Sequence, residues 1–322
     1  MASSTTYNTA GNREDLTDIL TILEPEACPL TSLASKKKAT GTFFEWQVDD
    51  LSTAEFAGVS EGEDVTSFAN KAANRTRLGN YVQKLRRPFM VSDMQQLVDT
   101  AGVANEFANS ESKAIRELKR DFEAAICSAQ DRQAEAGAGS PYKTRGMFKW
   151  LGVGGQPADV PAAFQNVAND TGGSPVTETE FNAVLQALYS ANGMPGGQLT
   201  LLAGPTLKAD ISNFSRTSTA TSTTYQVTQP AESKKVTLSV NLYDGDFGLV
   251  AVTPSVFLNR TSGVSTVDAN AGLLIDPEYV SVYTLKAESR SELEDQGGGQ
   301  RGFADLIAGI SCGSPKAHGY FN

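Results

Sequence analysis

The sequence predicts an α+β protein with long loops, in which helices and strands do not alternate regularly. A long amphipathic segment in the first half predicts one extended helix, and short alternating apolar segments predict strands. Glycine, serine and threonine are abundant, which favours many turns over a helical bundle. The chain has 322 residues, of which 40% are hydrophobic and 20% are charged. It is therefore expected to bury a hydrophobic core in one large domain or two smaller domains.

The N-terminal residues 1–13 are polar and are expected to form an arm. Asn12 is suited to cap a short helix, which Pro25 and Pro29 then interrupt. One more helical turn is expected at 29–33, and the lysine-rich residues 36–41 are expected to form a polar turn. Alternation of apolar and polar side chains predicts a strand at 42–48.

Residues 49–77 have little hydrophobic period, although strands are predicted before them and again at 81–92. An unstructured stretch of about thirty residues is unusual inside a compact domain and usually functions outside its own core. We therefore expect residues 51–80 to form a long two-stranded excursion.

Charge is sorted along this excursion. In the first part and the strand before it, all charged residues are acidic: Glu45, Asp49, Asp50, Glu55, Glu61, Glu63 and Asp64. In the second part and the strand after it, all charged residues are basic: Lys71, Arg75, Arg77, Lys84, Arg86 and Arg87. The two parts could pair with each other or with a neighbouring subunit. Alternatively, the charges serve only to keep a hairpin solvated.

The strongest periodic signal predicts a helix over about residues 103–135. Its apolar stripe includes Ile115, Leu118, Phe122 and Ile126, and the glycines at 137 and 139 are expected to end it. At 1.5 Å per residue, such a helix would be about 45–50 Å long, which suits a structural element better than a catalytic one.

The second half is predicted to mix short helices and strands. Thr177 and Glu180 form a capping-box pattern that opens a helix to about residue 192, and a second helix is expected at 206–214. Strands are expected at 199–203, 236–243, 247–252, 273–275, 280–285 and 302–311. The turn at 244–246 contains Asp-Gly, which favours a hairpin. A short strand or turn is expected at 146–152, and a polar loop at 292–300.

No group of residues forms a recognisable reaction centre. The single histidine, His318, lies near the C-terminus and is expected to belong to a tail. Cys28, Cys127 and Cys312 are widely spaced, so neither a zinc site nor a disulfide framework is predicted. We therefore assign no catalytic, cofactor-binding or metal-binding residues, and we expect neither an enzyme nor a cofactor.

The overall charge limits the classes of partner. The formal net charge is −10 and the isoelectric point is about 4.8, which disfavours a protein that grips DNA phosphates. No apolar run approaches the roughly 20 residues of a membrane span, and the N-terminus lacks the pattern of a signal peptide. We expect a soluble protein made in the cytoplasm, with no membrane partner.

Several segments together resemble the major capsid (major head) protein family of tailed bacteriophages. They read NREDLTDIL at 12–20, PLTSL at 29–33, KAT at 38–40, FEWQVD at 44–49, ANRTRLGNY at 73–81, RELKRDFE at 116–123 and KAHG at 316–319. The resemblance is specific over the first 135 residues and looser in the middle of the chain.

The resemblance implies the common capsid fold of tailed phages. Residues 1–41 would form an N-terminal arm, and residues 42–92 an extended hairpin loop with its base strands. Residues 93–177 would form a peripheral domain that contains the long spine helix. Residues 178–285 would form mainly an axial domain, and residues 286–322 would return to the peripheral domain and end in a tail.

The implied function is self-assembly into pentamers and hexamers of an icosahedral phage head that encloses double-stranded DNA without binding it specifically. The shell would be a virion component assembled in the bacterial cytoplasm, with the portal and scaffolding or decoration proteins as further partners. The candidate inter-subunit contact residues are Glu61, Glu63, Asp64, Arg75 and Arg77.

Other functions remain as alternatives at this point. The chain could be another virion protein, such as a decoration or tail protein, although these tend to lack both the long helix and the excursion. A hydrolase with an unrecognised acidic site and a nucleic-acid-binding protein are less consistent with the residues. Some relatives of the fold cross-link subunits through Lys–Asn isopeptide bonds; no such pair can be assigned in this sequence, and non-covalent contacts are expected.

Overall fold

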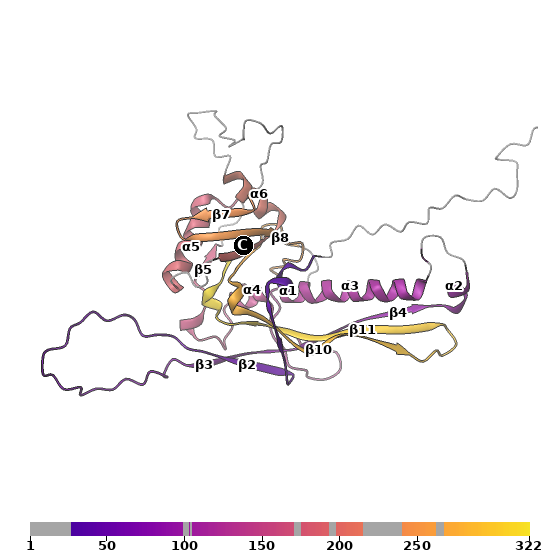
Figure 1. The fold of residues 1–322 in the computed structure, drawn as a ribbon, viewed down its shortest axis with the longest axis horizontal. Helices are drawn as coiled ribbons and strands as arrows, with labels where there is room; N and C mark the ends of the chain where they lie inside the picture. Colours follow the sequence, from indigo (N-terminus) through magenta and orange to yellow (C-terminus); the bar gives the residue numbers. More distant parts are fainter. Residues whose placement is uncertain are drawn as a thin grey trace, which may run out of the picture.

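Two sheets, one long helix and one projecting loop organise the chain (Figure 1). The computed structural model describes residues 27–98, 103, 105–170, 175–192, 198–214, 240–261 and 267–322. The predicted arm at 1–13 and the short helix predicted to start at Asn12 lie outside these residues. None of the described helices is long and apolar enough to cross a membrane.

The elongated part of the molecule is a four-stranded sheet in the order β1-β10-β11-β4. Its strands are β1 (Ser35–Lys38), β10 (Val280–Leu293), β11 (Gln300–Cys312) and β4 (Gln83–Val91). β1 pairs parallel with β10, and the other pairings are antiparallel. The predicted polar turn at 36–41 was therefore wrong for its first half, and the predicted strand at 280–285 continues to Leu293.

The second sheet has six strands in the order β5-β12-β9-β6-β8-β7. They are β5 (Ala168–Asp170), β12 (Gly319–Phe321), β9 (Gly272–Ile275), β6 (Gln198–Ala203), β8 (Gly248–Pro254) and β7 (Leu242–Gly245). Helices α5 (Glu178–Asn192) and α6 (Pro205–Phe214) accompany this sheet. The predicted capping box is confirmed, because the Glu180 N–H donates to the Thr177 hydroxyl and the Glu180 carboxylate accepts from the Thr177 N–H at 2.7 Å.

The long helix, α3, runs from Glu106 to Ile126 and lies along the four-stranded sheet (Figure 1). Asn105 caps it, and Leu118, Phe122 and Ile126 are buried as predicted. Its 21 residues correspond to about 32 Å, so the prediction of a helix from 103 to 135 was too long at both ends.

The early end of α3 has a tertiary cause. After the helix, Gln130 bonds to Gln83 and to the Thr144 carbonyl, while the Arg132 guanidinium donates to the Gly79 carbonyl. Gly146 lies so close to Ser128 that a Cβ there would meet the Ser128 carbonyl oxygen at 2.0 Å. These long-range contacts hold residues 128–136 in an irregular path that a continuing helix would not allow.

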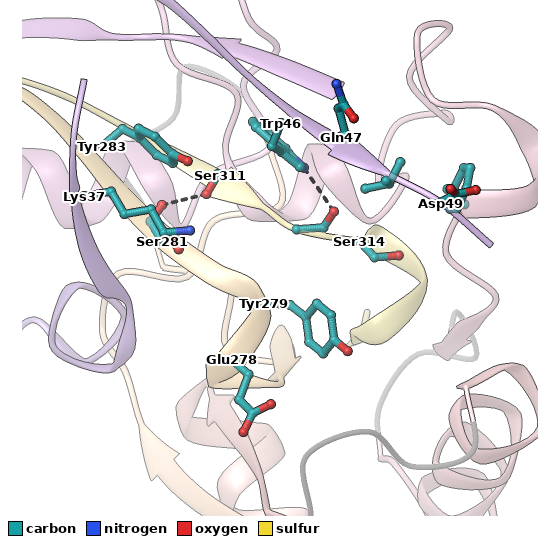
Figure 2. Close-up of a pocket in the computed structure, with 13 residues that line it drawn as sticks. Lys37, Trp46, Gln47, Asp49, Glu278, Tyr279, Ser281, Tyr283, Ser311 and Ser314 are labelled. Atoms are coloured by element: carbon teal, nitrogen blue, oxygen red, sulfur yellow. Dashed lines mark hydrogen bonds between the residues drawn. The ribbon is translucent and has the colours of Figure 1, made fainter. Parts of the chain in front are cut away.

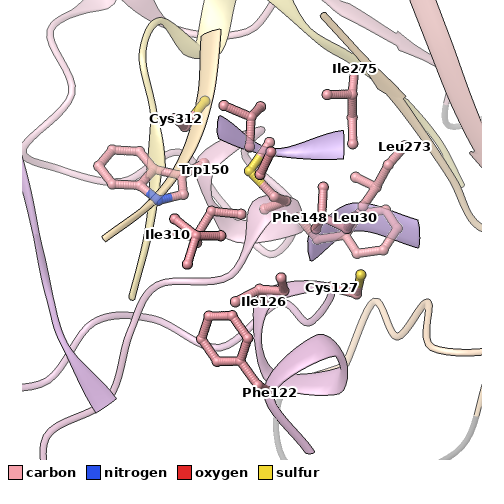
Figure 3. Close-up of a cluster of buried hydrophobic side chains, with 14 of the residues drawn as sticks. Leu30, Phe122, Ile126, Cys127, Phe148, Trp150, Leu273, Ile275, Ile310 and Cys312 are labelled. Atoms are coloured by element: carbon pink, nitrogen blue, oxygen red, sulfur yellow. The ribbon is translucent and has the colours of Figure 1, made fainter. Parts of the chain in front are cut away.

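The main core lies between α3 and both sheets (Figure 3). α1 (Pro29–Leu33) and α4 (Met147–Trp150) insert Leu30, Phe148 and Trp150 into it, all fully buried. The predicted turn at 29–33 is thus confirmed, and of the strand or turn predicted at 146–152 the structure shows a helical turn at 147–150. Because the six-stranded sheet contributes Leu273 and Ile275 and the four-stranded sheet Ile310 and Cys312, one core joins the two sheets.

The C-terminal segment is buried, so the prediction that His318 belongs to a tail was wrong. A short turn at Pro315–Ala317 leads into β12, where Phe321 is fully buried and stacks on Phe181 with ring centroids 5.4 Å apart. The His318 Nδ1 accepts a hydrogen bond from the Asp276 N–H at 3.2 Å. Burial lowers the pKa of His318 to about 3, so the imidazole is neutral near pH 7.

Candidate inter-subunit surfaces

The projecting loop is rooted in the core by a two-stranded antiparallel sheet of β2 (Phe43–Val48) and β3 (Thr76–Tyr81). Phe44 is buried in β2, and Leu78 is buried opposite Trp46 in β3. The Trp46 indole donates to the Gly313 carbonyl at 3.0 Å, and its ring lies 5.5 Å from that of Trp150. The base of the loop is therefore fixed, and its direction of projection is set by the fold.

Beyond this root, residues 49–75 contain no strand, and every one of them is exposed. The predicted two-stranded excursion over 51–80 therefore pairs only in β2 and β3. Between the two limbs lies an open space of about 650 Å³ with Glu55 and Lys71 among its lining residues. Apart from the pairs of Asp49 with Arg75 and of Asp50 with Lys316 at its root, the turn at its tip and hydrogen bonds between near neighbours in the sequence, the loop makes no side-chain hydrogen bond or ion pair that the structure describes.

The exposed loop carries large apolar side chains, which is unusual for a surface segment. They are Leu51, Phe56, Val59, Val65 and Phe68, exposed by between 72% and 102%. Removing apolar surface from water is worth about 25 cal/mol per Å². Clusters of this kind typically mark surfaces that bind another protein.

The tip of the loop is a turn at residues 60–63. Gly62 has a φ of +81°, a conformation that favours glycine, and the Glu63 N–H donates to the Ser60 carbonyl at 3.2 Å. The Ser60 N–H in turn donates to the Glu63 carboxylate. This geometry places the predicted contact residues Glu61, Glu63 and Asp64 together at the exposed tip.

The predicted basic contact residues lie far along the chain from this tip, at the root. Arg75 pairs with Asp49 of the same chain at 3.0 Å, and Arg77 is exposed on β3. Both members of the Arg75 pair are solvent-exposed, so it is worth less than about 1 kcal/mol. The sorted charges thus meet across the root, and no ion pair in the described residues joins the tip acids to Arg75 or Arg77.

A groove of about 380 Å³ lies beside β1, at the edge of the four-stranded sheet (Figure 2). Its apolar lining comes from Trp46, Val48, Phe164, Tyr279 and Tyr283. Lys37 lies at the groove with its ammonium 5.7 Å from the centre of the Tyr283 ring. Sequence reasoning missed this groove, because residues 36–38 were interpreted as part of a turn.

A second apolar patch lies at the distal end of the four-stranded sheet, around α2 (Asp93–Leu97) (Figure 1). Its exposed side chains are Met90, Met94, Leu97, Val98 and Leu293. The Met90 methyl group lies 3.0 Å from the position of a Cβ on Gly298, so the β10–β11 turn approaches β4 closely here. This end of the molecule is a further candidate contact surface.

The buried charged groups of the chain are bonded internally. Arg145 pairs with Asp131 at 2.6 Å and with Asp159 at 2.7 Å, and it lies over the Trp150 ring. Burial opposes ionisation of Asp159, but the hydrogen bonds from Arg145 and the positive charges of Arg145 and Arg132 together outweigh it and lower the pKa of that carboxyl. Arg145 thereby joins residues 131, 150 and 159 within the fold.

Glu123 is a second such group, on α3. Its carboxylate accepts from the Leu30 N–H at 2.7 Å and from the Thr31 N–H and hydroxyl, which joins α1 to α3. Burial raises the pKa of Glu123 despite these bonds. In the described residues, no group of three or more His, Cys, Asp or Glu side chains could hold a metal ion.

Comparisons with known proteins agree with the fold described above. The family model of the SU10 major capsid protein matches residues 3–322. The major capsid protein of Escherichia phage Phieco32 is 25% identical over 126 residues, which cover 39% of this chain and 36% of that protein. The match thus spans about a third of the length of that relative.

Solved structures with similar folds cover nearly the whole chain. The structure from Mycobacterium phage Che8 has a TM-score of 0.58 at 13% identity and covers 97% of each chain. The mature capsid of bacteriophage PhiM1 has a TM-score of 0.58 at 12% identity and covers 99% of this chain and 98% of its own. The capsid of a native GTA particle, computed with C5 symmetry, has a TM-score of 0.59 at 13% identity. The match covers 98% of this chain and 95% of the GTA chain.

These likenesses confirm the predicted α+β capsid fold. The family match also confirms the predicted resemblance and identifies a structural protein of the virion capsid, not an enzyme. The full-length match to one family model decides between the alternatives that the sequence left open. The chain belongs to the SU10 major capsid protein family of tailed phages.

Proposed function

We propose that this chain self-assembles into the pentamers and hexamers of an icosahedral phage head that encloses double-stranded DNA. The observation that carries the proposal is the loop at residues 49–75, which is rooted in the core yet exposes Phe56 and Phe68 almost completely. An isolated subunit gains nothing from such a loop, because exposed apolar surface is unfavourable in water. A neighbouring subunit that covers it explains both its rigid root and its composition.

In the proposed shell, the loop lies over an adjacent subunit, and the arm at 1–41 reaches another. Glu61, Glu63, Asp64, Arg75 and Arg77 are the proposed inter-subunit contacts. The four-stranded sheet with α3 would form the peripheral domain, and the six-stranded sheet would form most of the axial domain near the centre of each capsomer. The predicted boundary at residue 285 would then fall inside β10, and β12 would join the axial part.

The net charge supports a shell that encloses the genome without binding it tightly. A subunit with a formal charge of −10 repels DNA phosphates weakly, so DNA could pack without adhering to the inner surface. The portal and scaffolding or decoration proteins are the further partners that we propose.

The test is to express the chain alone and to measure its mass at low salt by size exclusion with light scattering. The largest fraction is then imaged by negative stain. Rings of five or six subunits, tubes or closed shells are expected. A matched variant replaces residues 52–72 with a short Gly-Ser linker, which is expected to fold normally and to stay monomeric.

A wild-type chain that stays monomeric on concentration, and also with co-expressed phage assembly factors, would contradict the proposal. Assembly of the loop-deleted variant to the same extent as wild type would contradict the role of the loop. Thermal unfolding of both proteins, followed by circular dichroism, controls for loss of fold.

A further inference from the structure

The three lysines of β1 form an exposed cationic edge. Lys36, Lys37 and Lys38 are consecutive and all exposed, and we call them the lysine edge. None of them forms an ion pair with any residue that the structure describes; Lys37 lies over the Tyr283 ring instead. Three like charges on adjacent residues repel one another, so an acidic partner would stabilise them.

The same strand is open on one side. β1 is the edge strand of the four-stranded sheet and pairs with β10 only, so no strand in the described part of the chain covers its outer edge. An open edge offers unpaired backbone N–H and C=O groups to an incoming extended segment. The edge is short and basic, which disfavours pairing with an identical strand of a second copy and favours an acidic one.

Beside this edge lies the groove described above, with the rings of Trp46, Tyr279 and Tyr283 along it (Figure 2). Asp49 and Glu278 also line it, but Arg75 neutralises Asp49 at 3.0 Å. The surface therefore combines an apolar recess, lined by Lys37 and by the exposed carboxylate of Glu278, with the lysine edge beside it. Its complement is an extended, acidic segment that carries an aromatic side chain.

The loop of the same chain has this composition. Residues 55–64 include Glu55, Glu61, Glu63 and Asp64 and contain no lysine or arginine. Phe56 follows Glu55 directly and is fully exposed. The segment is extended apart from the turn at 60–63, so an aromatic group and several carboxylates are presented together.

We propose that residues 55–64 of one copy dock on a second copy at the lysine edge, with Phe56 entering the groove beside it. This inference rests on the proposed assembly and names the surface that receives the loop. It differs from a contact between the tip acids and Arg75 or Arg77, because Arg75 already has a partner at the root of its own loop.

Charge reversal tests the pairing directly. One variant carries Lys36→Glu, Lys37→Glu and Lys38→Glu, and another carries Glu61→Lys, Glu63→Lys and Asp64→Lys. Each is expected to reduce the fraction of protein in shells by about tenfold or more, because like charges placed together cost several kcal/mol. The variant that combines all six substitutions is expected to recover assembly to within about twofold of wild type.

A matched control changes three other exposed lysines, as Lys84→Glu, Lys113→Glu and Lys143→Glu, with the same change in net charge. This control is expected to assemble like wild type. The six substituted side chains of the test variants are exposed, so thermal unfolding of the subunits is expected to stay unchanged. A Phe56→Ala variant is expected to weaken assembly without changing subunit stability.

A second experiment locates the contact. Shells are assembled from equal parts of ¹⁵N-labelled and unlabelled subunits and treated with a carbodiimide, which joins a lysine amine to a carboxylate with loss of water. Mass spectrometry is expected to find mixed-isotope peptides that join residues 36–38 to residues 55–64. Links within one copy only, or to other segments only, would overturn the docking.

The outcomes separate the two proposals. Wild-type shells together with normal assembly of the lysine variant would overturn the docking and leave the proposed function in place. Loss of assembly in both triple variants without recovery in the combined variant would overturn the pairing of these two surfaces. A wild-type chain that never assembles would overturn the proposed function and the docking with it.

Discussion

The loop at residues 49–75 and the short C-terminal segment at residues 313–321 both carry aromatic residues, but these residues differ in exposure. Phe56 and Phe68 in the loop are exposed by 102% and 86%. In the C-terminal segment, which contains a short turn and β12, Phe321 is fully buried, and Tyr320 is exposed by only 7%. Aromatic content alone therefore does not show whether a segment belongs to the core of the subunit.

The difference depends on where each segment finds its partners. The C-terminal segment adds β12 between β5 and β9, and His318 accepts a bond from Asp276 within the same chain. The contacts of the loop with the rest of the described chain lie at its root, through Trp46, the pair of Arg75 with Asp49, and the pair of Asp50 with Lys316 of the C-terminal segment at 3.8 Å. One segment completes the fold of the subunit, and the other is expected to be completed by a second subunit.

The largest expected contrast is between two phenylalanines. Phe321→Ala should lower the free energy of unfolding by about 3–5 kcal/mol, because it removes a fully buried ring and leaves a cavity. Phe56→Ala should change it by less than about 0.5 kcal/mol, since Phe56 is exposed in the subunit. Urea unfolding of the two unassembled variants measures both values, and equal effects would break the comparison.

A buried ion pair should matter more than an exposed one. Arg145→Met leaves Asp159 and Asp131 without their buried partner and should cost about 3 kcal/mol of unfolding free energy. The remaining pair of Arg132 with Asp159 at 3.3 Å limits the loss. Denaturant unfolding at neutral pH tests this value. A cost below about 1 kcal/mol would show that the pair is no more important than a surface pair.

The buried histidine gives the C-terminal segment a pH dependence that the loop lacks. The pKa of His318 is about 3 in the fold and about 6.5 when unfolded, so the unfolded state binds more protons between these values. The free energy of unfolding should therefore fall as the pH is lowered from 6.5 towards 3, by up to about 1.4 kcal/mol per pH unit.

A His318→Gln variant isolates this contribution. Burial raises the pKa of the neighbouring Asp276, but that group titrates in both proteins, so its effect largely cancels in their difference. The stability advantage of wild type over the variant should shrink by about 1.6 kcal/mol between pH 6.5 and pH 5. An advantage that stays constant over this range would show that His318 does not titrate as described.

The smallest effect is expected at the root of the loop. Arg75→Ala removes an exposed ion pair with Asp49 and should cost less than about 1 kcal/mol. The cost should decline further at high salt, where exposed charges are screened. A larger or salt-independent loss, measured by thermal unfolding at low and high salt, would mean that the pair has a structural role in orienting the loop.

Local signals in the sequence predicted several elements well. The capping box of Thr177 and Glu180 fixed the start of α5, because both partners lie within one helical turn. The apolar stripe with Leu118 and Phe122 identified α3, and the absence of period after residue 48 identified the loop. Each of these signals depends only on residues close together in the chain.

Long-range partners explain what the sequence did not predict. β1 forms because residues 35–38 pair with residues 281–284 of β10. All four residues of β1 are exposed, so its sequence shows no alternation of apolar and polar side chains. α3 stops early because Gln130 and Arg132 bind residues near 80. His318 is buried because Asp276 and β9 lie beside it. Within the candidate site, the acidic residues at the loop tip could be predicted from the charge pattern of the sequence. The groove could not, because its lining residues come together only in the folded chain.

The central claim is that the loop is completed by another subunit, and hydrogen exchange tests it most directly. Amide exchange is compared between assembled shells and subunits kept unassembled. The account predicts that residues 49–75 and β1 become strongly protected in the shell, while residues 313–321 are protected to the same extent in both states. Equally fast exchange of the loop in shells and free subunits would contradict the claim.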